Sequence, residues 1–238
     1  MVVLDSANTN RSTLIAETSH TPEALQKRRF WVEWPESQEL LHLLKALFAP
    51  IQVSRILHKH KHYFLPIGRK AYVWPIVSGW AIPSRTSSDG RSKCTQLVGP
   101  RDIIGISAFG GNERELEVYP LTDVAVVGIT SLSFCTALRQ NLSLASLMFT
   151  YASNCYARAL DEIERVSLYP LEDRLKVMED WLTNSPVKHL SDTEAGWIVG
   201  AHPGSVSRAT IRSKEQELIA HDNDSRPANE VKDLSCVS

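Results

Sequence analysis

One stretch of the sequence decides the fold: Leu190-Ser-Asp-Thr-Glu-Ala-Gly-Trp-Ile-Val-Gly-Ala-His-Pro-Gly-Ser-Val-Ser-Arg208. Its pattern is that of two short helices joined by a turn. Ser191 or Thr193 can cap the first helix, and Gly200 can end it in the left-handed conformation that glycine adopts readily. Pro203 suits the first turn of the second helix, because the N–H that proline lacks would have no partner there. The stretch therefore predicts a helix-turn-helix.

The second of these helices is expected to present hydroxyl groups and guanidinium groups to solvent. Such side chains are what a recognition helix carries into the major groove of DNA. We expect Trp197, Ile198 and Val206 to be core residues. An ordinary helical hairpin that only packs a core has the same spacing and is the alternative. The predicted DNA contacts are Arg208 first, then Ser207, Ser205, His202, Arg212, Thr193 and Asp192.

The same stretch resembles the winged helix-turn-helix of the CRP/FNR superfamily of bacterial transcription regulators. The family pattern is T/S-x-x-E-I/A-G-x-I/L-V/L-G, then V-S-R, then a helix that ends in E-x-x-L-I. The resemblance implies a homodimer that places two recognition helices in successive major grooves of an inverted-repeat operator on double-stranded DNA. The matching residues are Ser191, Glu194, Ala195, Gly196, Ile198, Val199, Gly200, His202, Val206, Ser207, Arg208, Glu215, Leu218 and Ile219.

Short runs of β-branched and aromatic residues fill residues 51–129, after a predicted helix over residues 35–48. The candidate strands are residues 53–57, 60–65, 72–78, 79–82, 95–98, 103–104, 115–118 and 124–129, with a hairpin turn at Ser88-Asp89-Gly90. This spacing predicts an antiparallel sandwich or jelly roll. The resemblance implies an α+β protein with a β-roll like a cyclic-nucleotide-binding domain. The similar landmarks are Gly68, Ile76-Val77-Ser78-Gly79, Asp89-Gly90 and Asp102-Ile-Ile-Gly105.

A long helix is predicted over residues 131–168, where apolar residues step by three and four. A helix packed only on its own roll is the alternative, but a narrow seam favours a parallel homodimer, as the resemblance also implies. The predicted dimer seam is Leu144, Met148, Ala152, Cys155, Ala159, Ile163 and Val166.

The expected organisation has four parts. A flexible arm covers residues 1–29, the β-roll sensory domain covers 30–130, and the dimerisation helix covers 131–168. The helix-turn-helix domain covers 169–238, begins at a hinge in Ser167-Leu-Tyr-Pro170, and ends in a flexible tail with a reduced or absent wing.

The candidate effector pocket departs from the family pattern. In the family, Gly and Glu hold the ribose of a cyclic nucleotide, Arg and Ser hold its phosphate, and hydroxyls of the dimer helix hold its base. Gly105 and Arg114 match, but Ile106 and Glu115 replace the Glu and the Ser. A carboxylate at position 115 would repel a phosphate and could pair with the arginine. The helix offers only Ala159 and Leu160 for the base. We therefore expect no ordinary binding of cyclic AMP or GMP; a small organic effector, or none, remains open.

Three histidines alternate with lysines in His58-Lys-His-Lys-His62. On a strand their rings would share one face, a geometry that could ligate a metal or haem. The favoured alternative is a solvated basic strand, which needs no ligand. No cofactor and no metal site is therefore expected, with haem as the option left open.

The composition is that of an ordinary soluble protein, with 43% hydrophobic and 22% charged residues in 238. The four cysteines, Cys94, Cys135, Cys155 and Cys236, are scattered, which argues against zinc, iron–sulfur and disulfide frameworks and fits a reducing cytoplasm. No membrane span or signal peptide is expected. An enzyme is not expected either, because no nucleophile–base pair or phosphate-cradling loop has usable spacing.

Charge gives DNA binding little support. The net charge is −1, and residues 171–221 carry eight acidic against six basic side chains. Pro203 and Gly204 stand where the best-characterised family members carry Arg or Glu. The leading prediction is a cytoplasmic, homodimeric DNA-binding transcription regulator. The alternative is a regulator-like protein with weak DNA binding that acts through protein partners such as RNA polymerase or another regulator.

Overall fold

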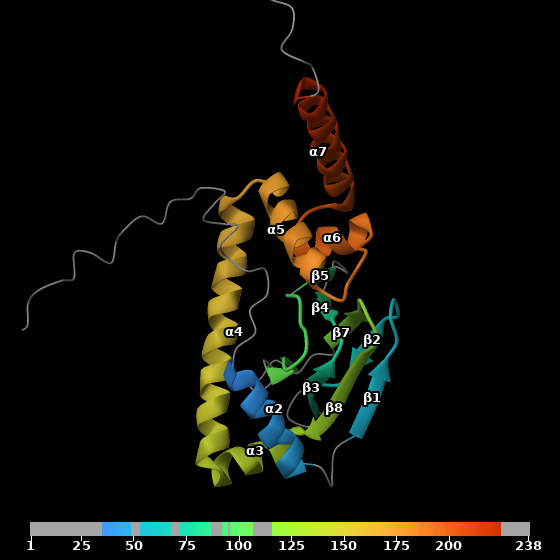
Figure 1. Ribbon diagram of the computed structural model, residues 1–238. Coiled ribbons are helices and arrows are strands. Elements are labelled where there is room, and N and C mark those ends of the chain that lie inside the picture. Colours follow the sequence, from blue (N-terminus) through green and yellow to red (C-terminus); the bar gives the residue numbers. More distant parts are fainter. Residues whose placement is uncertain are drawn as a thin grey trace, which may run out of the picture.

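A two-sheet β-roll lies beside one long helix, and three further helices lie beyond the end of the roll (Figure 1). The computed structural model describes residues 35–48, 53–67, 72–86, 92–94, 96–106 and 116–224. The predicted turn at residues 88–90 and Gly68 lie outside this part of the chain. The α+β class and the antiparallel roll are confirmed.

In the part of the chain that the structure describes, each sheet of the roll has four strands. The first has the order β1 (Val53–Leu57), β8 (Val124–Thr130), β3 (Tyr72–Ser78) and β6 (Ile103–Ile104). The second has the order β2 (Tyr63–Leu65), β7 (Leu116–Pro120), β4 (Ala81–Thr86) and β5 (Ser92–Cys94). All neighbouring strands run antiparallel. Three predicted strands are corrected. Residues 60–62 lie outside any strand and precede β2, and β4 starts at Ala81. In the predicted strand at 95–98, Val98 makes only an isolated bridge to Ala81, and β5 precedes it.

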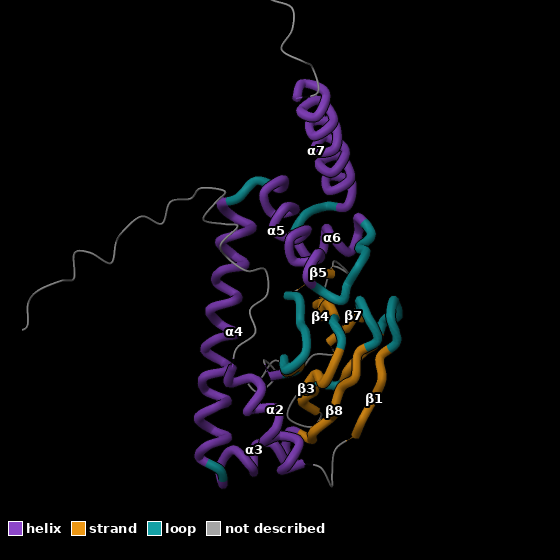
Figure 2. Tube along the Cα trace, in the orientation of Figure 1, coloured by secondary structure: helices purple, strands orange, loops and turns teal. Residues whose placement is uncertain are grey.

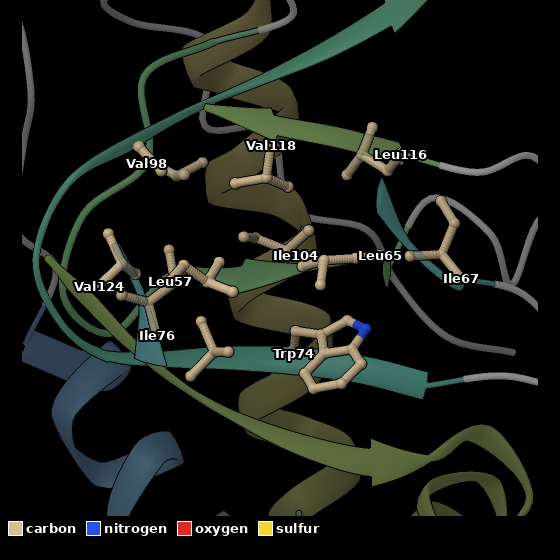
Figure 3. Packing of buried hydrophobic residues seen from close by; sticks show 12 residues of the cluster. Leu57, Leu65, Ile67, Trp74, Ile76, Val98, Ile104, Leu116, Val118 and Val124 are labelled. Atoms are coloured by element: carbon tan, nitrogen blue, oxygen red, sulfur yellow. The ribbon is translucent and has the colours of Figure 1, made fainter. Parts of the chain in front are cut away.

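The core of the roll lies between the two sheets. Figure 3 shows Trp74 and Ile76 of β3 facing Leu116 and Val118 of β7 across this space. The Trp74 ring is fully buried, and its Nε1–H donates to the carbonyl of Pro66 at 3.2 Å. Alternation along β7, with every second residue buried, places one face of the second sheet in this core.

A helical layer covers the outer face of the first sheet. It consists of α2 (Pro35–Phe48), α3 (Ser131–Gln140) and α4 (Leu142–Leu168). Its side chains pack on the outward face of β3 and β8, so these strands are buried on both faces. The buried residues of this layer include Leu40, Leu44, Phe134, Leu144 and Met148.

The helices α5 (Leu171–Asn184), α6 (Asp192–Val199) and α7 (Pro203–Asp224) follow the predicted break after α4. Their core is shared with the roll, because Trp80, Leu97 and Leu121 pack in one cluster with Leu175 and Ile198. The rings of Trp80 and Trp181 meet edge to face with centroids 5.2 Å apart. Figure 2 shows α6 above the roll and α7 extending away from it. No helix in the described part of the chain is long and apolar enough to cross a membrane.

Candidate nucleic-acid interface

The N-terminus of α6 is fixed by a capping box. The Ser191 hydroxyl accepts a hydrogen bond from the Glu194 backbone N–H at 3.2 Å, and the Glu194 carboxylate accepts one from the Ser191 backbone N–H at 2.7 Å. Of the two caps that the sequence allowed, Ser191 is therefore the one used. Glu194 is only 4% exposed although it carries a carboxylate.

The turn between α6 and α7 is braced by two neighbouring helices. Gly200 ends α6 with φ 69°, as the sequence predicted. Arg174 of α5 donates from Nη1 to the carbonyl of Val199, and burial lowers its pKa against the opposing pull of Glu162. Val166 of α4 lies so close that a Cβ on Gly200 would come within 2.9 Å of its Cγ2. The turn is thereby tied to both α4 and α5.

The start of α7 is held by His202. Its Nδ1 accepts from the Gly204 backbone N–H at 3.2 Å, and its carbonyl accepts from the Ser205 N–H at 2.9 Å. Ile198 and Val206 are buried, as predicted, whereas Trp197 is half-buried and meets Tyr119 of the roll.

The predicted DNA-contacting residues lie at or near the surface of this unit. Arg208 Nη2 donates to the Ser205 hydroxyl at 3.3 Å, and Arg212 Nη2 lies 3.6 Å from a carboxylate oxygen of Glu172. The spacing of Ser205, Arg208 and Arg212 puts all three on one face of α7. Asp192, Thr193, His202, Arg208 and Arg212 are exposed, and Ser205 and Ser207 are half-buried.

The structure describes four of the six residues of the predicted effector pocket. Gly105 is buried next to Ile67, and Ile106 is half-buried. Ala159 and Leu160 are exposed on α4. The other two pocket residues, Arg114 and Glu115, lie outside the described residues.

A polar cluster that the sequence did not reveal joins the roll to α4. Arg158 Nη2 lies 3.0 Å from Asp102 Oδ1, and both side chains are largely buried. The Tyr151 hydroxyl accepts from the Ile103 N–H at 2.7 Å and donates to Asp102 at 3.4 Å. Burial, followed by the Asp102 charge, raises the Tyr151 pKa well above its usual value. Burial also raises the pKa of the neighbouring Cys155 thiol.

The histidine segment is not the predicted strand. Residues 58–62 lie outside any strand, with a turn at residues 59–60 and His60 at φ 58°, so the three rings do not line one strand face. Each ring meets a different carboxylate instead. Among the described residues, no group of three or more His, Cys, Asp or Glu side chains could hold a metal ion. The three nearest approaches are His58 to Asp123 at 3.8 Å, His60 to Glu194 at 3.1 Å and His62 to Glu117 at 2.5 Å.

The predicted dimer seam merges two faces of α4. Leu144 and Met148 are buried against the chain's own roll and α2, so these two are corrected, and Cys155 is half-buried beside them. Ala152, Ala159, Ile163 and Val166 lie instead on an exposed face. That face also carries Leu142, Phe149 and Tyr156.

The comparisons with known proteins show similarity of structure only. No family model matches the sequence, and no curated protein matches it. Among solved structures, the c-di-GMP-responsive global regulator CLP of Xanthomonas campestris has a TM-score of 0.60 at 16% identity, over 76% of this chain and 93% of that one.

Two further structures are described as CRP/FNR family transcriptional regulators. The one from Eubacterium rectale has a TM-score of 0.60 at 13% identity, over 77% of this chain and 88% of that one. The regulator TTHA1359 of Thermus thermophilus has a TM-score of 0.56 at 18% identity, over 69% and 87%. The chain therefore has the fold of the CRP/FNR transcription regulators.

Proposed function

We propose that this chain is a DNA-binding transcription regulator that acts as a homodimer on an inverted-repeat operator, without control by ordinary cyclic AMP binding. The observation that carries the proposal is the shared face of the half-buried Ser205 and the exposed Arg208 and Arg212 on α7, a helix that follows a braced turn. A guanidinium and a small hydroxyl on one helix face can contact base edges and phosphates. The structural neighbours are regulators rather than enzymes.

The exposed face of α4 supports the homodimer. Leu142, Phe149, Tyr156 and Ile163 recur every seven residues and are 86%, 76%, 67% and 63% exposed. A small or medium apolar side chain follows each of these four residues at a distance of three positions. Such a heptad repeat of alternating large and small residues suits knobs-into-holes packing of two helices. In addition, soluble proteins rarely leave an apolar surface of this length exposed to solvent. The smaller positions are Ala145, Ala152, Ala159 and Val166.

The junction of roll and α4 supports independence from cyclic AMP. Arg158 is engaged with Asp102 from the chain itself. At the neighbouring positions Ala159 and Leu160, α4 offers no hydroxyl for a base. An anionic ligand would have to compete with a carboxylate that is already in place.

The test is selection of bound fragments from a random pool of double-stranded DNA, at low and at moderate salt. Wild type should enrich an inverted repeat. Arg208→Ala should weaken binding to the enriched fragment at least tenfold, because each dimer loses two contacts of about 1–3 kcal/mol. Arg139→Ala removes another exposed arginine, on α3, and should leave affinity unchanged. Failure to enrich any fragment over bulk competitor contradicts the proposal.

A regulator-like protein that acts through protein partners is the second candidate. It is favoured by the charge of residues 171–221, which carry eight acidic against six basic side chains. It is also favoured by the ion pair between Arg212 and Glu172, because this arginine is one of the two on the α7 face that is proposed to contact DNA. Under this candidate, purified RNA polymerase would bind the protein while no DNA fragment is enriched.

A further inference from the structure

Only one of the three histidine–carboxylate pairs crosses from the roll to α6. His58 meets Asp123 and His62 meets Glu117, and both carboxylates belong to the roll. His60 meets Glu194 of α6, which is 134 residues away in the sequence. This contact therefore joins the roll to the helical unit that carries the proposed DNA-reading face.

Glu194 uses its two carboxylate oxygens for different partners. Oε2 accepts hydrogen bonds from the backbone N–H and the hydroxyl of Ser191, at 2.7 and 2.9 Å, which caps α6. Oε1 lies 3.1 Å from Nδ1 of His60. Any change at His60 therefore acts on the side chain that also fixes the start of α6.

The carboxylate is held in its ionised form. Burial raises the pKa of Glu194, but hydrogen bonds from the backbone and hydroxyl of Ser191 and from Tyr119, together with the His60 charge, outweigh it and leave the pKa below its ordinary value of 4.5. Glu194 is thus negative throughout the range in which histidine side chains change charge.

The backbone of His60 is held in place, and its side chain is accessible to solvent. Its backbone has φ 58°, and its N–H donates to the carbonyl of Pro120 at 2.9 Å. Its ring is 48% exposed, and the same Nδ1 lies 3.1 Å from the Tyr119 hydroxyl. Tyr119 in turn meets Trp197 of α6 edge to face, with centroids 5.3 Å apart. The titratable and charged groups near His60 in the described part of the chain include Glu194 of α6, Tyr119 of β7, Lys59, Lys61 and His62 in the same segment, and Asp123, which accepts from the Lys59 backbone N–H at 2.9 Å.

We propose that the His60–Glu194 pair is a proton-sensitive clasp that sets how firmly α6 and α7 are docked on the roll. Protonation of His60 places a cation against a buried carboxylate, so the docked arrangement is favoured as the pH falls through the range of histidine titration. At higher pH the attraction between the imidazolium and the carboxylate is lost, and the docking loosens. The lysines on either side repel the protonated ring but lie in the same segment in both arrangements, so they do not reverse the direction.

Hydrogen exchange of the free full-length protein tests the clasp. Backbone amide protection is measured by mass spectrometry at about pH 5.5 and about pH 8, with labelling times scaled to the intrinsic exchange rates. Protection of α6 should be about threefold higher in acid, because a partly exposed ion pair is weak. His60→Asn should abolish this difference, and asparagine tolerates the left-handed backbone at this position.

Two further variants separate the clasp from general charge effects. His62→Asn removes the pair with Glu117 inside the roll, and α6 should keep its acid-dependent protection. Ser191→Ala weakens the cap at both pH values but leaves the His60 contact, so the ratio between the two pH values should persist. If α6 shows no pH difference in wild type, or if His60→Asn keeps it, the clasp is refuted. Because no DNA is used, this outcome is independent of the proposed function.

Discussion

Arg158 of α4 and Asp102 of the roll form a buried ion pair, with Nη2 and Oδ1 3.0 Å apart. Tyr151 adds a hydrogen bond to the same carboxylate, and the Gly99 backbone N–H donates to it at 2.9 Å. The pair lies where the roll meets the proposed dimerisation helix. It therefore couples the position of α4 to that of the sheet.

Removing the Arg158 guanidinium should destabilise the protein. Arg158→Met leaves Asp102 charged in a buried site, and the free energy of unfolding in urea should fall by about 3–5 kcal/mol. The double variant Asp102→Asn/Arg158→Met should recover part of that loss, because no buried charge remains. Arg139→Met changes an exposed arginine of α3 and should have little effect. Equal losses for the single and the double variant would contradict the ion-pair account.

The turn between α6 and α7 requires glycine at position 200. Gly200→Ala places a side chain at φ 69° and against Val166, so we expect a loss of about 2 kcal/mol in the free energy of unfolding. Val166→Ala in the same chain should return some of it. At Gly204 an added Cβ would come no closer than 3.4 Å to the His202 ring, which is an ordinary contact, and Gly204→Ala should be nearly neutral. Chemical denaturation of the four proteins measures these differences.

The exposed face of α4 predicts opposite effects on dimerisation for two alanine-to-glutamate variants. Ala152→Glu places a charge in the heptad row and should convert the dimer to a monomer in sedimentation experiments, because two such charges would face each other across the seam. Ala157→Glu makes the same change at an exposed position outside the row and should leave the dimer intact. A monomeric wild type, or dissociation by both variants, would exclude pairing through this row.

The ionisation of Glu194 should make the free energy of unfolding depend on pH. Its folded-state pKa is lowered below the ordinary value of 4.5, so its contribution is present above that value and is lost as the pH falls through the folded-state pKa. The stability advantage of wild type over Glu194→Gln should therefore shrink as the pH falls below 4.5, where the carboxylate itself becomes protonated. The exposed Glu215→Gln variant should show no such trend. A constant wild-type advantage over Glu194→Gln across the acid range would be evidence against this assignment.

Local signals predicted the α6–α7 unit well. The cap at Ser191, the end of α6 at Gly200 and the start of α7 at Pro203 depend on neighbouring residues, so the sequence contains the information. The roll was predicted from the same kind of pattern, although short strands such as β5 shifted because turn positions are set by pairing with distant strands.

The predictions from sequence were wrong where one local pattern of residues is compatible with two different long-range arrangements. Leu144 and Phe149 both belong to rows with helical spacing, and only the position of the roll decides which row is buried. The histidines alternate as they would in a strand, but the Pro120 carbonyl and a left-handed His60 make the segment a turn. The approach of His60 to Glu194 depends on domain docking, which no local motif encodes.

The most direct test of the central claim is a hydroxyl-radical footprint on the selected DNA fragment, with wild type and Arg208→Ala compared at equal salt. A homodimer that reads DNA with α7 predicts two protected stretches, related by the inverted repeat and about one helical turn apart. Arg208→Ala should lose both stretches together. A single protected stretch, or a symmetric footprint that Arg208→Ala leaves unchanged, would contradict the claim.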